Sequence, residues 1–586
     1  MQAVYNIAEI CARHGITDVV LSPGSRSAPL TLAFARHSEL TVRVVPDERA
    51  AAFIGLGIAQ AQRRAVALVC TSGTAGLNYA PAVAEAFFQQ IPLLIFTADR
   101  PPEWIDQLDG QTIRQHNLYG AHAKGAFEFP VDTAHPDAKW FSARLINEAI
   151  NLAQAAPAGP VQVNVPLREP FYPKAGELIG YEKDVKIIRD KTDYWQPSPN
   201  SIDGRWDWPK HLPFPSRVLI VVGQQQPMEG HLKNLLQQMA EEGFPIVGDV
   251  ISNVVCAEGF ITKQDVIFSA AGPELLRELR PELLITFGKS LISKGLKNYL
   301  RKYPAAVHWH VQPDMAPVAD TFGSLTNIYR AEPVMFLQKL AGAFSDEMPA
   351  KLINIRSYGQ RWRDANHKAQ SVLTAFLDQD DLESWGDIDG WNEFWMFNFI
   401  LGEIPSHTAL HLANSMAVRY ANILGIPPGR QIEVFANRGT SGIDGCTSTA
   451  VGAALAQPER PVVLLTGDVA FFYDRNAFWH NYPLPNLRVV LFNNHGGGIF
   501  RIIDGPRQQP ELEEFFETRQ ALTAENTARD FNLRYFPVSS FEELEAALPV
   551  FFAAETGAAL LEVFTDSKTN AAFFEEYRSA VKAAFA

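Results

Sequence analysis

The stretch PVVLLTGD, residues 461–468, is a short apolar run that stops at a glycine and an aspartate. A second run, LRVVLFNN (487–494), stops in the same way at two asparagines. Short runs rich in β-branched residues and bounded by turn residues are typical of strands that are buried on both faces of a parallel sheet. Ligands bind such sheets beyond the carboxyl ends of the strands. The polar residues at these two ends are therefore the first candidates for chemistry.

Apolar runs separated by helical stretches recur in three regions of the chain. The remaining predicted strands are 18–24, 42–48, 65–73, 92–101 and 160–166 in the first region, 217–227, 244–250, 282–291 and 306–313 in the second, and 432–439 in the third. Alternation of this kind predicts an α/β fold with three doubly wound, parallel-sheet domains.

Changes in composition predict the domain boundaries. Residues 184–216 are charged, aromatic and rich in proline, which indicates a linker. A mostly helical stretch precedes the third region. The predicted organisation is a first α/β domain (1–183), the linker (184–216), a central α/β domain (217–345), a helical bridge (346–400) and a third α/β domain (401–586).

Bulk composition excludes several classes of protein. The 586-residue chain is 47% hydrophobic and carries a net charge of −14, which argues against general nucleic-acid binding because phosphates need a positive field. No apolar run is long enough to span a bilayer, and the N-terminus does not resemble a signal peptide. Cys11, Cys70, Cys256 and Cys446 are widely spaced and favour neither disulfides nor a zinc site, so we expect a cytoplasmic protein.

Asp468 and Asn494 together suggest a metal site. A carboxylate and an amide at neighbouring strand ends supply hard oxygen ligands, which Mg²⁺ prefers alongside phosphate oxygens. Gly467 would allow a phosphate to approach the backbone, and the turn after Asn494 would offer the carbonyl of Gly496. Taken alone, Asp468 is explained as a helix cap and Asn494 as the start of a turn. The presence of both residues at neighbouring strand ends favours a metal site over these two separate explanations.

These residues resemble the diphosphate-binding motif of thiamine-diphosphate-dependent enzymes, although Val469 stands where that motif usually has a glycine. The resemblance implies thiamine diphosphate as cofactor, held through Mg²⁺ (with Mn²⁺ as an alternative) by Asp468, Asn494 and Gly496. It also assigns Gly467 to cofactor binding. In these enzymes the first domain of one subunit faces the third domain of its partner, so a homodimer or homotetramer is expected.

Glu48 ends the predicted strand 42–48 and begins a helix of small residues. In the enzymes that the chain resembles, a glutamate here hydrogen-bonds N1′ of the aminopyrimidine and favours the imino tautomer that activates the cofactor. A carboxyl group buried there would hold its proton more tightly than in water. Alone, Glu48 would be an ordinary helix N-terminal acid. Thr71, Ser72 and Gly73, at the end of the next strand, are further candidates for cofactor binding.

The whole chain resembles one family more closely, the 2-succinyl-5-enolpyruvyl-6-hydroxy-3-cyclohexene-1-carboxylate (SEPHCHC) synthases of menaquinone biosynthesis. Its distinctive segments are LSPGSRSAPL (21–30), PDERAAAFIGLG (46–57), TSGTAGLNYAPAVAEA (71–86), TADRPPE (97–103), NRGTSGIDG (437–445) and NNHGGGIF (493–500). The resemblance implies decarboxylation of 2-oxoglutarate and a 1,4-addition of the resulting four-carbon unit to isochorismate.

Both implied substrates are dicarboxylates, and arginine binds carboxylates through two parallel hydrogen bonds. The resemblance assigns Arg419 and Arg438 to catalysis and substrate binding, Ile443 to an apolar wedge under the cofactor, and Ser415 to both cofactor and substrate. The other implied substrate residues are Ser25, Arg26, Arg100, Gln111, Lys294, Ile499, Phe500 and Ile503, of which Ile499 and Phe500 also contact the cofactor. Two positions depart from the family pattern: Gly110 stands where a substrate-contacting asparagine is often found, and Gly295 follows Lys294 where an arginine can occur.

Three alternatives remain open from the residues alone. The nearest is another thiamine-diphosphate enzyme, either an acetohydroxyacid-synthase-like carboligase or a 2-oxo-acid decarboxylase, which the arginine-rich strand ends fit poorly. A nicotinamide-dependent dehydrogenase would need a G-x-G-x-x-G turn after its first strand, whereas GLGIAQA (55–61) lies inside a predicted helix. The third alternative is a binding protein without catalysis on the same fold.

Overall fold

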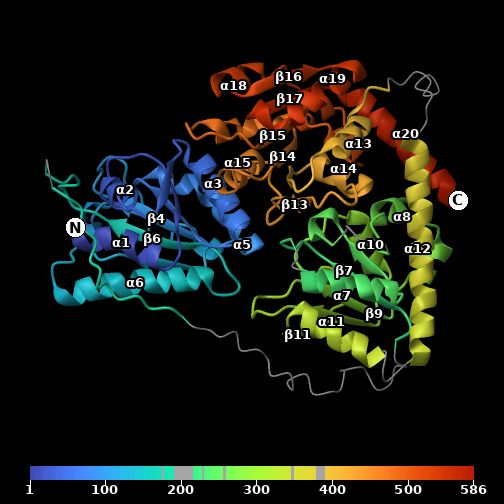
Figure 1. Cartoon of the computed structure of the whole chain (residues 1–586), viewed down its shortest axis with the longest axis horizontal. Coiled ribbons are helices and arrows are strands. Elements are labelled where there is room, and N and C mark those ends of the chain that lie inside the picture. Colours follow the sequence, from blue (N-terminus) through green and yellow to red (C-terminus); the bar gives the residue numbers. More distant parts are fainter. Residues whose placement is uncertain (175–176, 191–214, 228–229, 255–258, 345–348, 378–389) are drawn as a thin grey trace.

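The computed structural model describes residues 1–174, 177–190, 215–227, 230–254, 259–344, 349–377 and 390–586. Within these residues the chain forms three separate sheets with helices packed around them (Figure 1). Every pairing between named strands is parallel. The prediction of an α/β fold with three parallel sheets is confirmed.

The first sheet has six strands in the order β2-β1-β3-β4-β6-β5. The predicted strands are present as β1 (Asp18–Leu21), β2 (Thr41–Val44), β3 (Val66–Cys70), β4 (Leu93–Asp99) and β6 (Val161–Pro166). The sheet also contains β5 (Gly125–Glu128), an edge strand that was not predicted because it is short and only partly buried. Its principal helices are α1 (Gln2–Arg13), α2 (Ala28–Ala35), α3 (Glu48–Gln62), α5 (Ala80–Gln89) and α6 (Pro136–Gln154).

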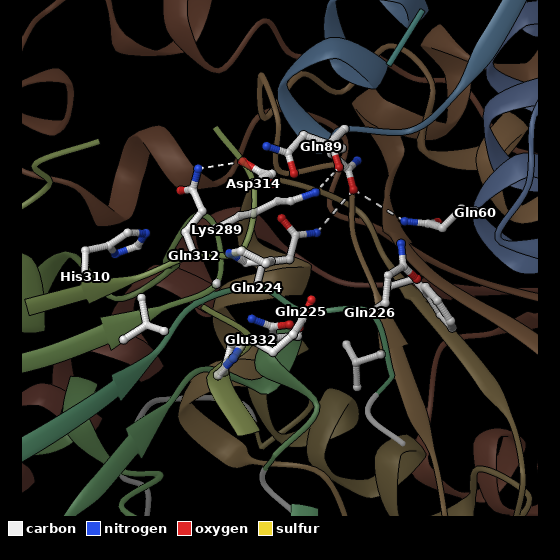
Figure 2. Close-up of a pocket in the computed structure, with 17 residues that line it drawn as sticks. Gln60, Gln89, Gln224, Gln225, Gln226, Lys289, His310, Gln312, Asp314 and Glu332 are labelled. Atoms are coloured by element: carbon white, nitrogen blue, oxygen red, sulfur yellow. Dashed lines mark hydrogen bonds between the residues drawn. The ribbon is translucent and has the colours of Figure 1, made fainter. Parts of the chain in front are cut away.

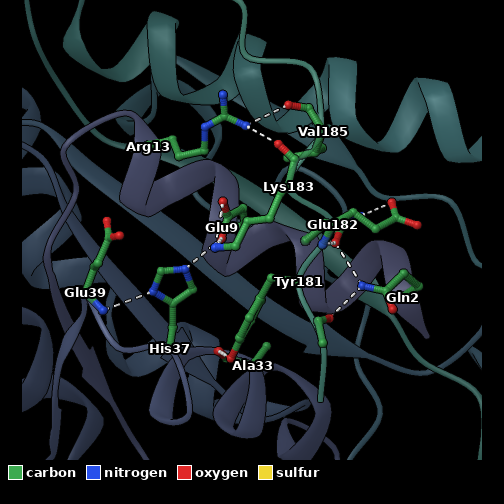
Figure 3. Close-up of polar contacts among 12 residues, drawn as sticks. Gln2, Glu9, Arg13, Ala33, His37, Glu39, Tyr181, Glu182, Lys183 and Val185 are labelled. Carbon is green, nitrogen blue, oxygen red and sulfur yellow. Dashed lines mark hydrogen bonds and ion pairs between the residues drawn. The ribbon is translucent and has the colours of Figure 1, made fainter. Parts of the chain in front are cut away.

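The segment that follows the first sheet is tied to α1 and α2 by polar contacts (Figure 3). The hydroxyl of Tyr181 donates to the carbonyl of Ala33 at 2.7 Å, and Lys183 Nζ lies 3.2 Å from Glu9 Oε2. The same oxygen of Glu9 lies 3.0 Å from Nε2 of His37. The first residues of the predicted linker contact α6, where the amide of Ile188 donates to Asn147 Oδ1.

The central sheet has five strands in the order β11-β10-β9-β7-β8. Its strands are β7 (Val218–Val222), β8 (Ile246–Gly248), β9 (Leu283–Phe287), β10 (Val307–Val311) and β11 (Asn327–Tyr329). The first four were predicted, and β11 was missed because it is a short edge strand that lacks a buried face. The helices around this sheet include α7 (Gly230–Glu241), α8 (Gln264–Ala270), α10 (Lys294–Lys302) and α11 (Pro333–Gly342).

The third sheet has six strands in the order β13-β12-β14-β15-β17-β16. They are β12 (Ala409–Leu412), β13 (Glu433–Phe435), β14 (Val462–Gly467), β15 (Leu487–Asn493), β16 (Arg534–Val538) and β17 (Ala559–Phe564), of which β12, β16 and β17 were not predicted. The helices that matter most here are α13 (Glu393–Glu403), α14 (Met416–Leu424), α15 (Cys446–Ala456), α16 (Asp468–Tyr473) and α20 (Ser567–Phe585).

A long helix, α12 (Pro349–Leu377), connects the central sheet with the third and accounts for most of the predicted bridge (Figure 1). It contributes Trp362, which is fully buried, to a core shared with residues of α8 and α20. Residues 191–214 of the predicted linker and 378–389 of the bridge lie outside the described residues, so the domain boundaries stay predictions. In the part of the chain that is described, no helix combines the length and apolar character needed to cross a membrane.

Candidate functional site

The carboxyl ends of β14 and β15 bring the predicted metal ligands to one edge of the third sheet. Gly467 pairs with Phe492 in the register of the two strands, so the residues that follow each strand are neighbours. Asp468 is the first residue of α16, and Asn494 opens the glycine-rich turn. The simpler expectation, that Asp468 caps the helix, is wrong in detail: Gly467 is the N-cap residue, and Asp468 is the first residue of the helix itself.

Asp468 is almost fully buried, with 2% of its surface exposed. Its Oδ2 accepts a 2.8 Å hydrogen bond from Nε2 of Gln520, and its Oδ1 accepts one of 2.8 Å from the amide of Val469. Burial raises the pKa of Asp468 to about 6, and these bonds together with the Gly496 amide oppose the rise. A desolvated carboxylate in such a place is stabilised by a cation.

The side-chain amide of Asn494 has a hydrogen-bond partner for its nitrogen and none, among the described residues, for its oxygen. Its Nδ2 donates to Oε2 of Glu393 at 3.0 Å. Its Oδ1 is buried and has no hydrogen-bond partner within the described structure. Buried acceptors are rarely left unsatisfied, so an orphan of this kind calls for an explanation such as an ion.

The turn after Asn494 depends on glycine. A side chain at Gly496 would place Cβ 2.8 Å from the carbonyl oxygen of Glu517, and one at Gly498 would place it 2.8 Å from Nδ2 of Asn494. The amide of Gly497 donates to the Glu517 carbonyl at 2.7 Å, which ties the turn to a covering loop. Close packing therefore keeps this backbone beside the two ligands.

This donor set fits the group that the sequence implies. It comprises a carboxylate, an orphan amide oxygen and a backbone turn, which match the oxygen preference of Mg²⁺ better than that of a transition metal. Among the described residues, no group of three or more His, Cys, Asp or Glu side chains is placed so that it could hold a metal ion. Asp468, Asn494 and Gly496 are thus the residues that would hold Mg²⁺ and, through it, a diphosphate.

Glu48 lies at the start of α3, where Asp47 caps the helix by accepting from the amide of Ala50. Its side chain is partly buried, and burial, followed by the charge of Asp47, raises its pKa. The side chain of Asp47 accepts from Asn476 Nδ2 at 2.8 Å, so the start of α3 contacts the third domain of the same chain. In the described part of the chain, no hydrogen bond or ion pair joins Glu48 to Asp468.

The end of β3 holds two further orphan groups. The hydroxyl oxygens of Thr71 and Ser72 are buried, and neither has a partner within the described residues. Gly73 adopts φ +85°, and its amide donates to Oε1 of Gln115 at 2.8 Å. A polar ligand at this strand end would satisfy both hydroxyl groups.

Arg419 and Arg438 form a cationic cluster beside α14. Arg438 Nη1 donates to Asn414 Oδ1 at 2.9 Å, while its Nε is buried without a partner among the described residues. Burial lowers the pKa of Arg419, and the nearby charge of Arg438 lowers it further. Arg419 donates to the carbonyl of Ser415, a non-glycine residue at φ +75°. Strained backbone and mutually repelling cations are typical of a site that binds an anion.

Lys297 joins this cluster and was missed by the sequence analysis. Burial lowers its pKa, as do the charges of Arg438 and Arg419. The predicted Lys294 lies one helical turn earlier on α10 and is exposed. The spacing of three residues between the two lysines is the signal that could have identified Lys297.

The substrate residues predicted in the first domain lie elsewhere, at the ends of β1 and β4. Arg26 is buried, donates to the Leu167 carbonyl at 3.0 Å and stacks 4.5 Å over the ring of Phe171. Arg100 pairs with Asp109 at 2.7 Å and donates to the carbonyl of Gly110. Ser25 and Gln111 are exposed. Among the described residues, no hydrogen bond or ion pair joins this group to Arg419 or Arg438.

The two departures from the family pattern differ in their surroundings. No atom lies within 4 Å of a Cβ built at Gly110, so this position faces open space. A Cβ at Gly295 would lie 3.1 Å from Cβ of Phe268. A larger residue therefore fits at the first position and only tightly at the second.

The predicted apolar residues divide into two groups. Ile443 packs against Ala413, Cys446 and Ala470, the last of which is two residues beyond Asp468. Phe500 contacts Phe516, with ring centroids 5.9 Å apart, and Ile503 is 36% exposed. Ile499 packs against the core that lies beneath the third sheet. Ile443 therefore lies beside the helix that begins at Asp468, and Ile499, Phe500 and Ile503 follow the glycine-rich turn after Asn494.

Two cavities lie beyond the carboxyl ends of the central strands. One, of about 570 Å³, extends from Phe87 and Lys289 to Arg438. The other, of about 260 Å³, is rich in glutamine (Figure 2). Gln60 and Gln224 both donate to Oε1 of Gln89 there, so the first and central domains meet at this cavity. Of the predicted site residues, Arg438 alone lines either of these cavities.

Two family models match parts of this chain. Residues 1–121 match the thiamine pyrophosphate enzyme N-terminal TPP binding domain, and residues 418–563 match the thiamine pyrophosphate enzyme C-terminal TPP binding domain. The two matches contain Glu48 and Asp468 respectively.

Several curated relatives are similar over nearly the whole chain, and each is named 2-succinyl-5-enolpyruvyl-6-hydroxy-3-cyclohexene-1-carboxylate synthase. The protein of Cytophaga hutchinsonii is 43% identical over 100% of both chains. That of Porphyromonas gingivalis is 39% identical over 96% of this chain and 94% of its own, and that of Flavobacterium johnsoniae is 36% identical over 98% and 97%. These relatives do not favour the acetohydroxyacid-synthase-like or dehydrogenase alternatives. The chain is therefore a thiamine-diphosphate-dependent enzyme that belongs to the SEPHCHC synthase family.

Proposed function

We propose that this chain is a transferase of menaquinone biosynthesis that removes CO₂ from 2-oxoglutarate and adds the remaining four-carbon unit to isochorismate by a 1,4-addition. The names of its relatives support the reaction. The single observation that carries the site is the orphan Oδ1 of Asn494 beside the buried carboxylate of Asp468.

Mg²⁺ is the proposed ion, held by Asp468, Asn494 and the carbonyl of Gly496, with Mn²⁺ as an alternative. Thiamine diphosphate, when bound, supplies the carbon centre that allows a 2-oxo acid to lose CO₂ and form a carbon–carbon bond. The support for the metal is chemical: the burial that raises the pKa of Asp468 to about 6 would be offset by a divalent cation.

Glu48 would hold a proton for the cofactor ring. Because burial raises its pKa, its carboxyl group keeps a proton more readily than one in water and can share it with a ring nitrogen. The hydroxyl groups of Thr71 and Ser72 would donate hydrogen bonds to the same ligand, and Gly73 would let the ligand approach the backbone closely.

The cluster of Arg419 and Arg438 would bind the carboxylates of 2-oxoglutarate, and Lys297 extends it. The mutual repulsion of the two arginines supports this role, because an anion between them would relieve it. Ser25, Arg26, Arg100, Gln111 and Lys294 would serve isochorismate. The apolar side chains of Ile443, Ile499, Phe500 and Ile503 would enclose the bound groups.

We further propose a homodimer or homotetramer in the cytoplasm, with each site formed between subunits. The family resemblance supports such a site, because in these enzymes the first domain of one subunit faces the third domain of its partner. The described cysteines, Cys11, Cys70 and Cys446, are buried free thiols, as expected of a reducing compartment.

The reaction is tested by incubating the purified protein with isochorismate, 2-oxoglutarate, thiamine diphosphate and Mg²⁺ and following the loss of isochorismate absorbance. We expect turnover that depends on all four components. Stable binding of the cofactor with no consumption of isochorismate would contradict the proposed acceptor.

A further inference from the structure

Glu393 lies at a junction that links the metal ligand Asn494 to two other elements. It is 5% exposed and occupies the first turn of α13, which Asn392 caps by accepting from the Trp395 amide. Its Oε2 accepts from Nδ2 of Asn494 at 3.0 Å and from Nδ2 of Asn570, at the start of α20, at 3.2 Å. One buried carboxylate oxygen therefore receives two amide groups.

Nδ2 of Asn494 is the atom that faces Glu393, and the ionised carboxylate of Glu393 selects this orientation because it accepts hydrogen bonds and donates none. The oxygen must then point the other way, and this is the buried Oδ1 that has no partner among the described residues. Without Glu393, the amide could rotate and present a donor to a cation, which would repel it.

The rest of the junction holds Glu393 in place. The amide of Glu393 donates to Oδ1 of Asn570 at 2.8 Å, so Asn570 is also fixed at both ends of its side chain. Asn570 Nδ2 donates to the hydroxyl of Thr565 at 3.0 Å, and the Thr565 amide donates to the carbonyl of Asn493 at 3.0 Å. The chain of contacts returns to the residue before Asn494, which makes the arrangement closed and rigid.

We propose that Glu393 is a positioning residue that orients the Asn494 amide so that its oxygen, and not its nitrogen, faces the metal ion. The inference rests on the proposed function, since it assumes that Asn494 is a ligand. Glu393 would then change the affinity for the metal only by changing the orientation of Asn494, without touching the ion itself.

Two substitutions of similar size separate orientation from packing. Glu393→Gln keeps an oxygen that can accept from both amides, whereas Glu393→Met fills the space and accepts nothing. Mg²⁺ affinity is measured by titration at saturating thiamine diphosphate, with the thermal unfolding temperature of the cofactor-free protein as the measure of folding. Glu433→Ala is the control. Glu433 lies on β13, an edge strand of the same sheet, and forms an ion pair with Arg460.

We expect Glu393→Met to raise the Kd for Mg²⁺ by roughly 10–100-fold, which is typical of losing the partner of a metal ligand. Glu393→Gln should stay close to the wild type, and so should Glu433→Ala. Unchanged affinity in a folded Glu393→Met protein would overturn the proposal. So would an equal loss in the Gln and Met variants, because the charge and not the orientation would then matter.

Asp468→Ala in the same titration separates this inference from the proposed function. If Asp468→Ala abolishes Mg²⁺-dependent cofactor binding and Glu393→Met changes nothing, only the role of Glu393 is wrong. If Asp468→Ala binds like the wild type, the metal site itself is wrong and the inference falls with it.

Discussion

Gly57 of α3 and Gly452 of α15 face each other where the first and third domains meet. A Cβ at Gly57 would lie 2.1 Å from the carbonyl oxygen of Thr449, and one at Gly452 would lie 2.1 Å from that of Ile54. The two helices therefore cross with their backbones in contact, which only glycine permits at both positions. Because α3 begins at Glu48, this crossing sets where Glu48 lies relative to the third domain.

Asp468→Ala should abolish binding of thiamine diphosphate in the presence of Mg²⁺, rather than only slow turnover. The substitution removes the one carboxylate among the proposed ligands. Calorimetry measures the affinity, and Asp530→Ala, an exposed acid of the same domain, is the control. An unchanged affinity in Asp468→Ala would remove the residue from the metal site.

Glu48→Gln should lower turnover by roughly 10²–10⁴-fold, the range typical of lost acid–base catalysis. Cofactor affinity should fall much less, because the amide keeps the shape of the side chain. Steady-state kinetics and calorimetry on the same preparation separate the two effects. Glu39→Gln, at an exposed position of the same domain, should behave as the wild type, and near wild-type turnover in Glu48→Gln would exclude it from the mechanism.

A mixture of Glu48→Gln and Asp468→Ala subunits should regain activity if each site uses the first domain of one chain and the third domain of another. In a mixed dimer, one of the two sites would then contain neither substitution. The measurement is activity after the subunits are exchanged, with exchange verified by mass. Activity that fails to return after exchange would place both residues of a site within one chain.

2-Oxoglutarate should exceed pyruvate as donor by about tenfold to a hundredfold in kcat/KM. Pyruvate has no distal carboxylate, so it would leave the exposed Arg419 and the half-buried Arg438 without an anionic partner. Arg419→Ala should narrow this gap by impairing 2-oxoglutarate selectively, and Arg438→Ala is the second candidate. Loss of Arg100 or Lys294 should instead raise the KM for isochorismate. Arg534→Ala, an exposed arginine, is the control. Equal efficiency with pyruvate in the wild type would argue for an acetohydroxyacid-synthase-like enzyme.

His411→Leu should make the protein more resistant to acid. Burial, with a smaller contribution from the charge of Arg460, lowers the pKa of His411 to about 3. The unfolded chain has a pKa of about 6.5 for histidine and so binds a proton that the fold excludes as the pH falls from about 6.5 towards 3. Stability is thus lost on acidification through this window, and leucine removes the effect.

The pH at which near-ultraviolet circular dichroism is half lost should therefore be lower in His411→Leu than in the wild type. His367→Leu, which replaces an exposed histidine, should leave that midpoint unchanged. A midpoint in His411→Leu that equals or exceeds that of the wild type would show that His411 does not contribute to acid unfolding.

The sequence by itself determined the fold class and the positions of most of the buried strands, but it missed β12 and β17. Runs such as 461–468 and 487–494 are apolar because both faces of the sheet are covered, and this pattern is local. The strands that escaped notice either lie at sheet edges, as β5 and β11 do, or end without a recognisable polar motif, as β17 does. Their pairing depends on neighbours that are distant in the chain.

The sequence also predicted Asp468 and Asn494 as metal ligands, because each ends a strand and parallel strands bring such ends together. Only the tertiary structure decided which atom of Asn494 is free, since Glu393 lies 101 residues away in sequence and on another element. The same holds for Gln520 beside Asp468 and Lys297 beside Arg438. Hydrogen bonds and charge pairs act over a few ångströms in space. The periodicity of a sequence does not indicate which residues, distant in the chain, the fold brings that close together.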